Sequence, residues 1–394
     1  MIILKNAFLI DGLRREPAAG ADVVIGGKHI LQVGRGLPVH RDDAVIDLHG
    51  LTLMPGLADA HLHLGGPFRF DEPPLLGGEA TDWYADKRKL LLDYGITNVR
   101  SGGDFEADML RLRGMTDAGN LDGPRIWTCG RAFQPVGGHP AYTVWQSAAD
   151  ILEKAVASPA SPMDAAAEVR RQVAAGVNHI KCFLADDNYM APGHKAPRLD
   201  PAILRAVMAE AHRCGRRTMV HCQDPGFALE ALNAGADSVE HLACSGHEGK
   251  ALPGGLIGSF LKRNAFCVPT MSAAFYYGYS PDAQAGLSGL VKTLFDNGVN
   301  IAAGTDAGTP NIPFGESVHK EMELFVEAGI PPMDAIISAT CQGAAVVGSD
   351  AFGTVLPEKL ADLVAVEGNP LDDITCTRNI RLVMKEGRIL RRAI

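Results

Sequence analysis

Several features that would mark a specialised protein are missing from this sequence. No apolar run approaches the roughly 20 residues that are needed to cross a membrane. Lys and Arg (37) are outnumbered by Asp and Glu (46), so the formal charge is −9 and neither a nucleic acid nor an acidic membrane is an expected partner. The eight cysteines form no CxxC pair, which favours reduced, buried thiols over a disulfide framework. Because the N-terminal residues show no basic leader or cleavage site, a cytoplasmic protein is expected.

What remains is the composition of an ordinary globular chain. Its 394 residues are 46% hydrophobic and 21% charged, which excludes disorder and collagen-like repeats. At roughly 150 residues per domain this length fits two to three domains, which a single α/β barrel would also satisfy. A small molecule is therefore the expected partner.

Both ends of the chain have the pattern of short β-strands. Apolar segments separated by turns that contain Gly or Asp occur at 2–10, 21–25, 29–33 and 44–47. Similar segments occur at 362–367 and 380–385, and residues 385–388 fit a hairpin turn. We predict that the two ends make one small β domain.

The segment between the two ends alternates short apolar runs with helical patterns, which is typical of βα units and a parallel sheet. The eight candidate strands are 56–63, 96–102, 125–130, 178–184, 217–222, 236–241, 265–269 and 300–306. Helical patterns such as 201–214 and 288–297 follow the strands. Eight units favour an α/β fold with a closed (β/α)8 TIM-like barrel over an open sheet.

Side chains with metal-binding chemistry stand where these strands end. They are His61 and His63 on the first strand, Lys181 on the fourth, His221 on the fifth, His241 on the sixth and Asp306 on the eighth. Each one alone has a structural explanation, such as a core histidine, an ion pair or a helix cap. Because such barrels build their active sites at the C-terminal ends of the strands, the set together indicates a site for a divalent metal such as zinc.

Residues 54–63, MPGLADAHLH, with the flanking β segments, resemble the amidohydrolase superfamily of metal-dependent hydrolases over nearly the whole chain. Residues 95–100, 137–139, 180–181 and 304–308 are similar to its prolidase-like branch, which includes Xaa-Pro dipeptidases. The resemblance implies a barrel of residues 56–354 and a composite β-sandwich domain of residues 1–55 and 355–394. It also implies a homo-oligomer.

The resemblance further implies a binuclear centre with two divalent ions, zinc first, with manganese or cobalt as alternatives. The implied ligands are His61, His63 and Asp306 for one ion, His221 and His241 for the other, and a bridging Lys181. Lys181 would be carboxylated by carbon dioxide to N6-carboxylysine, because an ammonium group cannot bind a cation. Hydroxide shared between the ions would attack the substrate carbonyl, and Asp306 would carry the proton to the departing nitrogen.

The implied activity is hydrolysis of an amide-type C–N bond in an N-acyl amino acid or an Xaa-Pro-like dipeptide. The same site could serve hydrolysis of a carbamate, ester, lactone or organophosphate, or a deamination. A non-catalytic scaffold would be expected to lack metal ligands, and this sequence lacks none of them.

Substrate contacts are harder to assign. Arg100, Arg131 and His139 are candidates to hold a substrate carboxylate, although each could pair with an acidic residue instead. Long loops are expected at 131–162, which contains Tyr142, and at 270–286. The aromatic residues of these loops, including the run from Phe275 to Tyr279, would line a pocket or pack a lid or subunit contact. Glu240 is expected to face away from the barrel interior.

Overall fold

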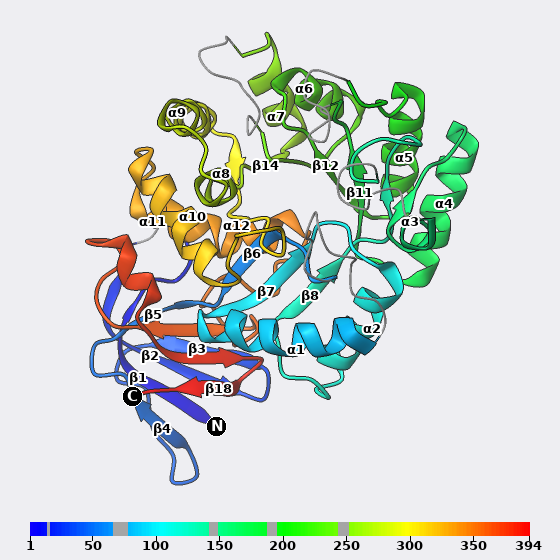
Figure 1. The fold of residues 1–394 in the computed structure, drawn as a ribbon. Helices are drawn as coiled ribbons and strands as arrows, with labels where there is room; N and C mark the ends of the chain where they lie inside the picture. Colours follow the sequence, from blue (N-terminus) through cyan, green and yellow to red (C-terminus); the bar gives the residue numbers. More distant parts are fainter. Residues whose placement is uncertain (14–15, 66–77, 142–148, 187–194, 243–251) are drawn as a thin grey trace.

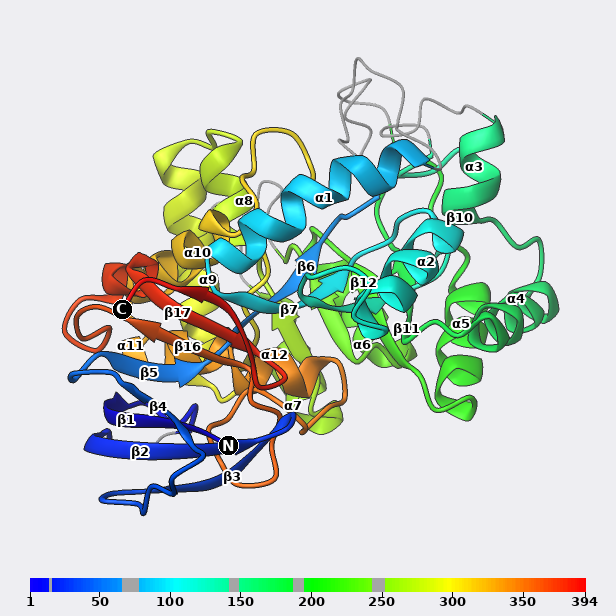
Figure 2. The same ribbon diagram turned by 90° about the horizontal axis from the view of Figure 1, so that it is seen from below.

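The computed structural model describes residues 1–13, 16–65, 78–141, 149–186, 195–242 and 252–394 and has a mixed α/β architecture (Figures 1 and 2). Antiparallel and parallel strands from the two chain ends form one sheet, and parallel strands from the middle of the chain form two more. Within these ranges, no helix combines the length and the apolar character needed to span a bilayer.

The first sheet is built from both ends of the chain, and both termini lie on it (Figure 1). Its strands are β1 (Ile2–Leu9), β2 (Ala18–Gly26), β3 (His29–Gly34), β4 (Ala44–Asp47), β5 (Thr52–Pro55), β16 (Leu363–Val366), β17 (Ile380–Lys385) and β18 (Arg388–Arg392). The order is β18-β17-β16-β5-β1-β2-β3, with β4 paired to β1. Antiparallel pairing of β16 with β5 joins the two chain ends, so the strands expected at both ends do share one sheet.

The parallel strands form a three-stranded and a seven-stranded sheet. The first contains β6 (Leu57–Leu62), β7 (Ile96–Ser101) and β8 (Arg125–Thr128); the second contains β9 (Ala132–Phe133), β10 (Val156–Ala157), β11 (His179–Phe183), β12 (Arg217–His221), β13 (Ser238–Glu240), β14 (Phe266–Val268) and β15 (Asn300–Ile301). Each of the eight expected strands overlaps one of these. An isolated bridge of Cys129 with His179 connects the two sheets, and another of Leu62 with Ala307 connects β6 to the turn after β15.

All eight strands are shorter than the sequence predicts, and β13 and β15 lose the most residues. β13 ends at Glu240 because His241 has a φ of 60°, which breaks the extended backbone. β15 ends at Ile301 because, from Ala303 on, the backbone hydrogen bonds go to segments other than β14. The Ala303 N–H donates to the Ser338 carbonyl (3.0 Å), and the Ala303 carbonyl accepts from the Ala60 N–H (2.8 Å). Asp306 therefore lies in a turn beyond the strand.

Helices alternate with the parallel strands. They are α1 (Gly78–Asp93), α2 (Glu106–Asp117), α3 (Ala149–Ala155), α4 (Pro162–Ala175), α5 (Pro201–Arg213), α6 (Pro225–Ala234), α7 (Leu256–Arg263), α8 (Met271–Tyr276), α9 (Pro281–Asp296), α10 (Glu316–Glu327), α11 (Pro332–Ser338), α12 (Cys341–Val346) and the 3₁₀ helix η1 (Ile374–Arg378).

One of the two expected long loops, 270–286, is largely helical, which corrects that part of the sequence prediction, whereas the described part of 131–162 is only partly regular. The segment 131–162 contains β9, α3 and β10, and the segment 270–286 contains α8 and the start of α9. Ser280 caps α9, its hydroxyl accepting from the Ala283 N–H at 3.2 Å, and Pro281 occupies the first turn. Ser followed by Pro is a recognised helix start, so this helix was predictable from its sequence.

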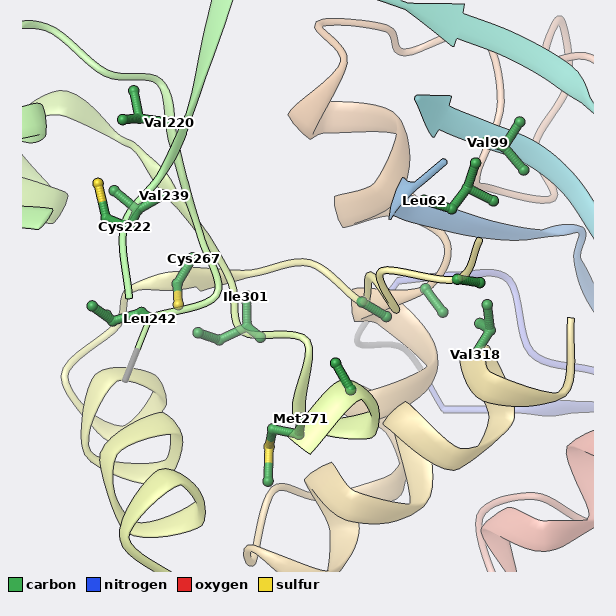
Figure 3. Packing of buried hydrophobic residues seen from close by; sticks show 14 of the residues in the cluster. Leu62, Val99, Val220, Cys222, Val239, Leu242, Cys267, Met271, Ile301 and Val318 are labelled. Carbon is green, nitrogen blue, oxygen red and sulfur yellow. The ribbon is translucent and has the colours of Figure 1, made fainter. Parts of the chain in front are cut away.

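The main apolar core lies between the parallel strands and their helices. Figure 3 shows Val220 of β12, Val239 of β13 and Cys267 of β14 near one another, with Leu62 of β6 and Val99 of β7 across from them. Close packing of this kind holds side chains in fixed rotamers. The polar residues at the strand ends therefore stand on a rigid base.

Alanine substitutions at two glycines, Gly387 in the turn and Gly289 in α9, test the hairpin between β17 and β18. Glu386 and Gly387 have φ values of 48° and 74°, as a type I′ turn requires, and a Cβ on Gly387 would collide with the Gly27 carbonyl. Gly387→Ala should therefore lower the free energy of unfolding by about 1–3 kcal/mol. Gly289→Ala in α9, where a Cβ meets no described atom within 4 Å, should raise it by about 0.5–1 kcal/mol. Urea unfolding of both variants would measure this, and equal effects would contradict the assigned turn.

Candidate metal centre

Three of the six expected ligands bring donor atoms together at the C-terminal ends of the strands. One ligand atom from each of His61, His241 and Asp306 lies within 4.8 Å of the other two. These residues come from β6, the end of β13 and the turn after β15. His61 is fully buried, whereas the Asp306 side chain keeps 15% of its exposure. The cluster could hold a cation and still present a carboxylate to a dissolved molecule.

The other expected ligands lie beside this cluster. His63 Nε2 is 3.2 Å from Asp306 Oδ1, and the His221 ring centroid is 4.7 Å from that of His241. Lys181 lies on β11, next to the strand that carries His221, with its Nζ 4.9 Å from the centroid of the Phe183 ring. All six expected ligands therefore lie at one end of the parallel strands.

Three buried polar atoms of this group have no hydrogen-bond partner among the described residues. They are His61 Nε2, His221 Nε2 and Lys181 Nζ. A buried polar group without a partner costs about 1–3 kcal/mol, so folded proteins rarely leave one without a reason. Bare imidazole nitrogens beside a carboxylate are the donor set that zinc and related divalent ions prefer. The residues present thus fit a metal.

In three of the imidazoles, the second ring nitrogen, Nδ1, has a hydrogen-bond partner. The Nδ1 partners are Glu240 for His61 at 2.7 Å, Asp104 for His63 at 3.1 Å and the Thr270 hydroxyl for His241 at 3.0 Å. A hydrogen bond at Nδ1 fixes the ring orientation and directs the Nε2 lone pair toward the site. Metal-ligating histidines commonly have such support.

Burial sets the charge of most of these side chains. It lowers the pKa of His61, His221 and His241 well below that of a free imidazole, so their rings are neutral. Burial also lowers the pKa of Lys181. A neutral imidazole can donate its lone pair to a cation, and a neutral amine can react with carbon dioxide.

His63 behaves in the opposite way. Burial lowers its pKa, but the carboxylates of Asp104 and Asp306 outweigh burial and raise the pKa to about 9. The two carboxylates therefore stabilise positive charge at this position. The position is electrostatically complementary to a cation.

Left-handed backbone conformations cluster at the site. His241, Thr270 and Asp306 have φ values of 60°, 51° and 64°. Such values are uncommon outside glycine and cost about 1–3 kcal/mol each. The turn at Asp306 is held by its N–H, which donates to the His61 carbonyl at 2.8 Å, and by its carbonyl, which accepts from Thr309. Three of the nine described non-glycine residues with a positive φ therefore lie at this site.

Arg100 and Arg131 form the ion pairs that the sequence left open as the alternative to substrate contacts. Arg100 NH2 donates to Glu240 at 2.8 Å, and Arg131 NH2 donates to Glu168 at 2.8 Å. The structure also corrects the expectation for Glu240. Its carboxylate faces the interior, because the left-handed turn at the next residue, His241, breaks the alternation of the strand.

The remaining substrate candidates fall into three groups. The buried His139 ring lies 4.7 Å from that of His221 and 5.0 Å from that of Phe183, and burial lowers its pKa to about 3. Tyr142 lies outside the described residues. Phe275 and Tyr277 are 41% and 38% exposed, and the Lys320 Nζ lies 4.4 Å from the centroid of the Phe275 ring.

Sequence reasoning missed four residues that shape the site. They are Glu240, Thr270, Asp104 and Gly102. The last three directly follow the ends of predicted strands or lie at them, which is a signal that could have found them. Gly102 matters because a Cβ on it would lie 2.5 Å from His61 Nε2. The missing side chain allows the His61 imidazole to pack directly against the backbone at Gly102.

Gly102→Ala tests whether the His61 imidazole binds a metal. Gly102 does not have a positive φ, so alanine fits the backbone, but its methyl group would lie only 2.5 Å from His61 Nε2 and should displace the imidazole. Zinc binding should weaken more than about tenfold, or about 1.4 kcal/mol, while the metal-free protein stays folded. Metal analysis and zinc titration measure this, with Gly114→Ala as control because a Cβ there meets no described atom within 4 Å. Unchanged zinc binding by Gly102→Ala would contradict this reading.

Known proteins resemble this chain over most of its length. Ochratoxinase from Aspergillus niger is 26% identical over 413 aligned residues, which cover 94% of this chain and 82% of that protein. A crystal structure of an Xaa-Pro dipeptidase with bound methionine in the active site is 28% identical, has a TM-score of 0.84 and covers 99% of both chains. The crystal structure of a putative prolidase from Bifidobacterium longum is 26% identical and has a TM-score of 0.80. The alignment covers 100% of this chain and 95% of that chain.

The family comparison settles the superfamily that the motifs suggested. The model of the amidohydrolase family matches residues 52–390, which include the metal cluster and most of the chain. With the likeness to an Xaa-Pro dipeptidase, the match confirms the resemblance to prolidase-like amidohydrolases. The chain belongs to the amidohydrolase family.

Proposed function

We propose that this protein is a metal-dependent hydrolase that cleaves an amide-type C–N bond in an N-acyl amino acid or an Xaa-Pro-like dipeptide. The observation that carries the proposal is the cluster of His61, His241 and Asp306, in which the buried His61 Nε2 has no hydrogen-bond partner among the described residues. The names of the similar proteins, an Xaa-Pro dipeptidase and a putative prolidase, support the substrate class.

The proposal includes the architecture. Residues 56–354 would form one closed (β/α)8 barrel, and residues 1–55 with 355–394 a composite β-sandwich domain. The bridge from Cys129 to His179 supports closure because it connects the two parallel sheets, and the bridge from Leu62 to Ala307 supports it because it connects β6 to the turn after β15. A separate apolar cluster in the first sheet, which includes Leu4 and Leu363, supports the division into domains.

Two divalent ions would complete the site. The proposed ligands are His61, His63 and Asp306 for one ion, His221 and His241 for the other, and Lys181 between them. When bound, such ions lower the pKa of water from 15.7 to about 7 and polarise a carbonyl oxygen. Lys181 would react with carbon dioxide through its neutral amine, forming an N–C bond and releasing one proton, and the resulting carbamate offers two oxygens. Its bare, buried Nζ and lowered pKa support this step.

Asp306 is the proposed proton carrier. It is the ligand candidate with a partly exposed carboxylate, 3.5 Å from His61 Nε2 and 3.2 Å from His63 Nε2. It would accept the proton released as the carbonyl is attacked and deliver it to the departing nitrogen. Proton transfer of this kind typically contributes 10²–10⁴-fold to a rate. His139, beside His221, is the proposed substrate contact.

Lys181→Ala tests the bridging role. Removing a buried amine that has no partner in the described structure should not destabilise the metal-free protein, yet hydrolysis should be lost and less metal should bind. Protein equilibrated with ¹³C-bicarbonate should show a carbamate carbon signal by NMR that the variant lacks. Lys195→Ala is the matched control, because that side chain is exposed and pairs with Asp186. Full activity of Lys181→Ala would contradict the role.

Metal removal and a substrate panel test the activity. The purified protein should contain about two divalent ions per chain, and a chelator should abolish hydrolysis that zinc, manganese or cobalt then restores. Turnover should be highest with dipeptides and N-acyl amino acids. An active metal-free enzyme would refute the metal dependence, and turnover confined to esters or phosphotriesters would refute the substrate class.

A further inference from the structure

The Arg100–Glu240 ion pair lies behind the cluster of His61, His241 and Asp306, and with 2% and 0% of their exposure left its two side chains are closed off from a dissolved substrate. We propose that this pair is the positioning element for His61, fixing which imidazole nitrogen faces the metal site. The proposal rests on the metal centre described under the proposed function. Glu240 and Arg100 would then act through His61 and not on the substrate.

Glu240 is fully buried and uses both carboxylate oxygens. Oε2 lies 2.7 Å from His61 Nδ1. Oε1 accepts from Arg100 NH2 at 2.8 Å and from the Ser238 hydroxyl. Charge-assisted hydrogen bonds from a guanidinium are strong and directional, so the carboxylate has little freedom to rotate away from the imidazole.

Arg100 also stabilises the backbone next to His61. Its side chain is 2% exposed, and its Nε donates to the Ala60 carbonyl at 2.6 Å, directly before His61 in the chain. NH1 donates to the Ser238 hydroxyl at 3.1 Å. Arg100 lies on β7 of the three-stranded sheet and Glu240 on β13 of the seven-stranded sheet. The pair therefore connects the two parallel sheets at the base of the site.

The chemistry of the pair decides the tautomer of His61. An ionised carboxylate can only accept hydrogen bonds, so Nδ1 must carry the hydrogen and Nε2 keeps its lone pair. Nε2 is the buried atom that has no partner among the described residues, and it lies 3.5 Å from Asp306 Oδ1. Arg100 NH2 lies 2.8 Å from Glu240 Oε1, so the buried carboxylate has an opposite charge beside it.

Stability alone does not explain this arrangement. Replacing a buried ion pair with apolar residues of similar volume is often neutral or stabilising, because burying two charges costs desolvation energy. Removing one partner is destabilising, since the other charge remains buried without compensation. A variant that removes both charges therefore separates a positioning role from a structural one.

The experiment compares Arg100→Met/Glu240→Leu with the full-length wild-type chain. Zinc affinity is measured by competition with a chelator, thermal stability is measured on the metal-free protein, and the absorption spectrum of the cobalt-loaded protein reports the coordination geometry. The double variant should keep stability near that of the wild type, lose about 10–100-fold in zinc affinity and show an altered cobalt spectrum.

A second buried ion pair supplies the control. Asp362 is buried, accepts from Arg125 at 2.7 Å and contacts none of the proposed ligands in its described hydrogen bonds. Asp362→Asn should lower stability and leave zinc affinity unchanged. If the double variant fails to fold, Arg100→Gln/Glu240→Gln makes the same comparison, because it also removes both charges and replaces them with side chains that can hydrogen-bond to each other.

The outcomes distinguish the two levels of the proposal. Wild-type protein that binds no zinc would refute the proposed metal centre itself. Wild-type protein that binds zinc, together with a folded double variant that binds it equally well, would overturn the positioning role alone. Zinc affinity that falls in Asp362→Asn as much as in the Glu240 variants would also overturn it, since the loss would then follow stability and not the contact to His61.

Discussion

The fixed position of His61 is the constraint on which the rest of the site depends. Its N–H donates to Asp59 Oδ1 at 3.1 Å, and its carbonyl accepts from the Asp306 N–H at 2.8 Å. Asp59 Oδ2 in turn accepts from the Thr305 hydroxyl at 2.6 Å. The first parallel strand is thereby tied to the turn that carries Asp306, while Glu240 holds the imidazole from behind. A ligand held at the backbone and at the ring needs little reorganisation to bind a cation.

The site lowers the stability of the folded chain, and the apolar core compensates for this. Left-handed backbones at His241 and Asp306, and bare nitrogens on His61 and His221, each disfavour the folded chain by about 1–3 kcal/mol. The apolar core behind the strands offsets these costs (Figure 3). Strain and unpaired polar atoms also occur elsewhere among the described residues, but here both occur together around one group of histidines and a carboxylate, which is the expected trace of a binding site.

Much of the fold could be predicted from the sequence, because periodicity and turn chemistry act locally. The strand pattern located eight of the ten strands in the two parallel sheets, and the Glu386–Gly387 turn required positive φ values that the structure shows. Positions at strand ends also located the histidines of the cluster. The direction of Glu240 was not predictable, because it depends on the left-handed turn at His241. The partners of Arg100 were equally hidden, since its carboxylate lies on a strand of the other sheet.

The most direct test of the account is anomalous X-ray diffraction from crystals of this protein loaded with zinc. The account predicts anomalous peaks at the ends of the parallel strands, one of them bonded to Nε2 of His61 and to the carboxylate of Asp306, with electron density extending from Lys181 Nζ toward it. Well-ordered side chains at these positions with no anomalous peak among them, in crystals grown at saturating zinc, would contradict it.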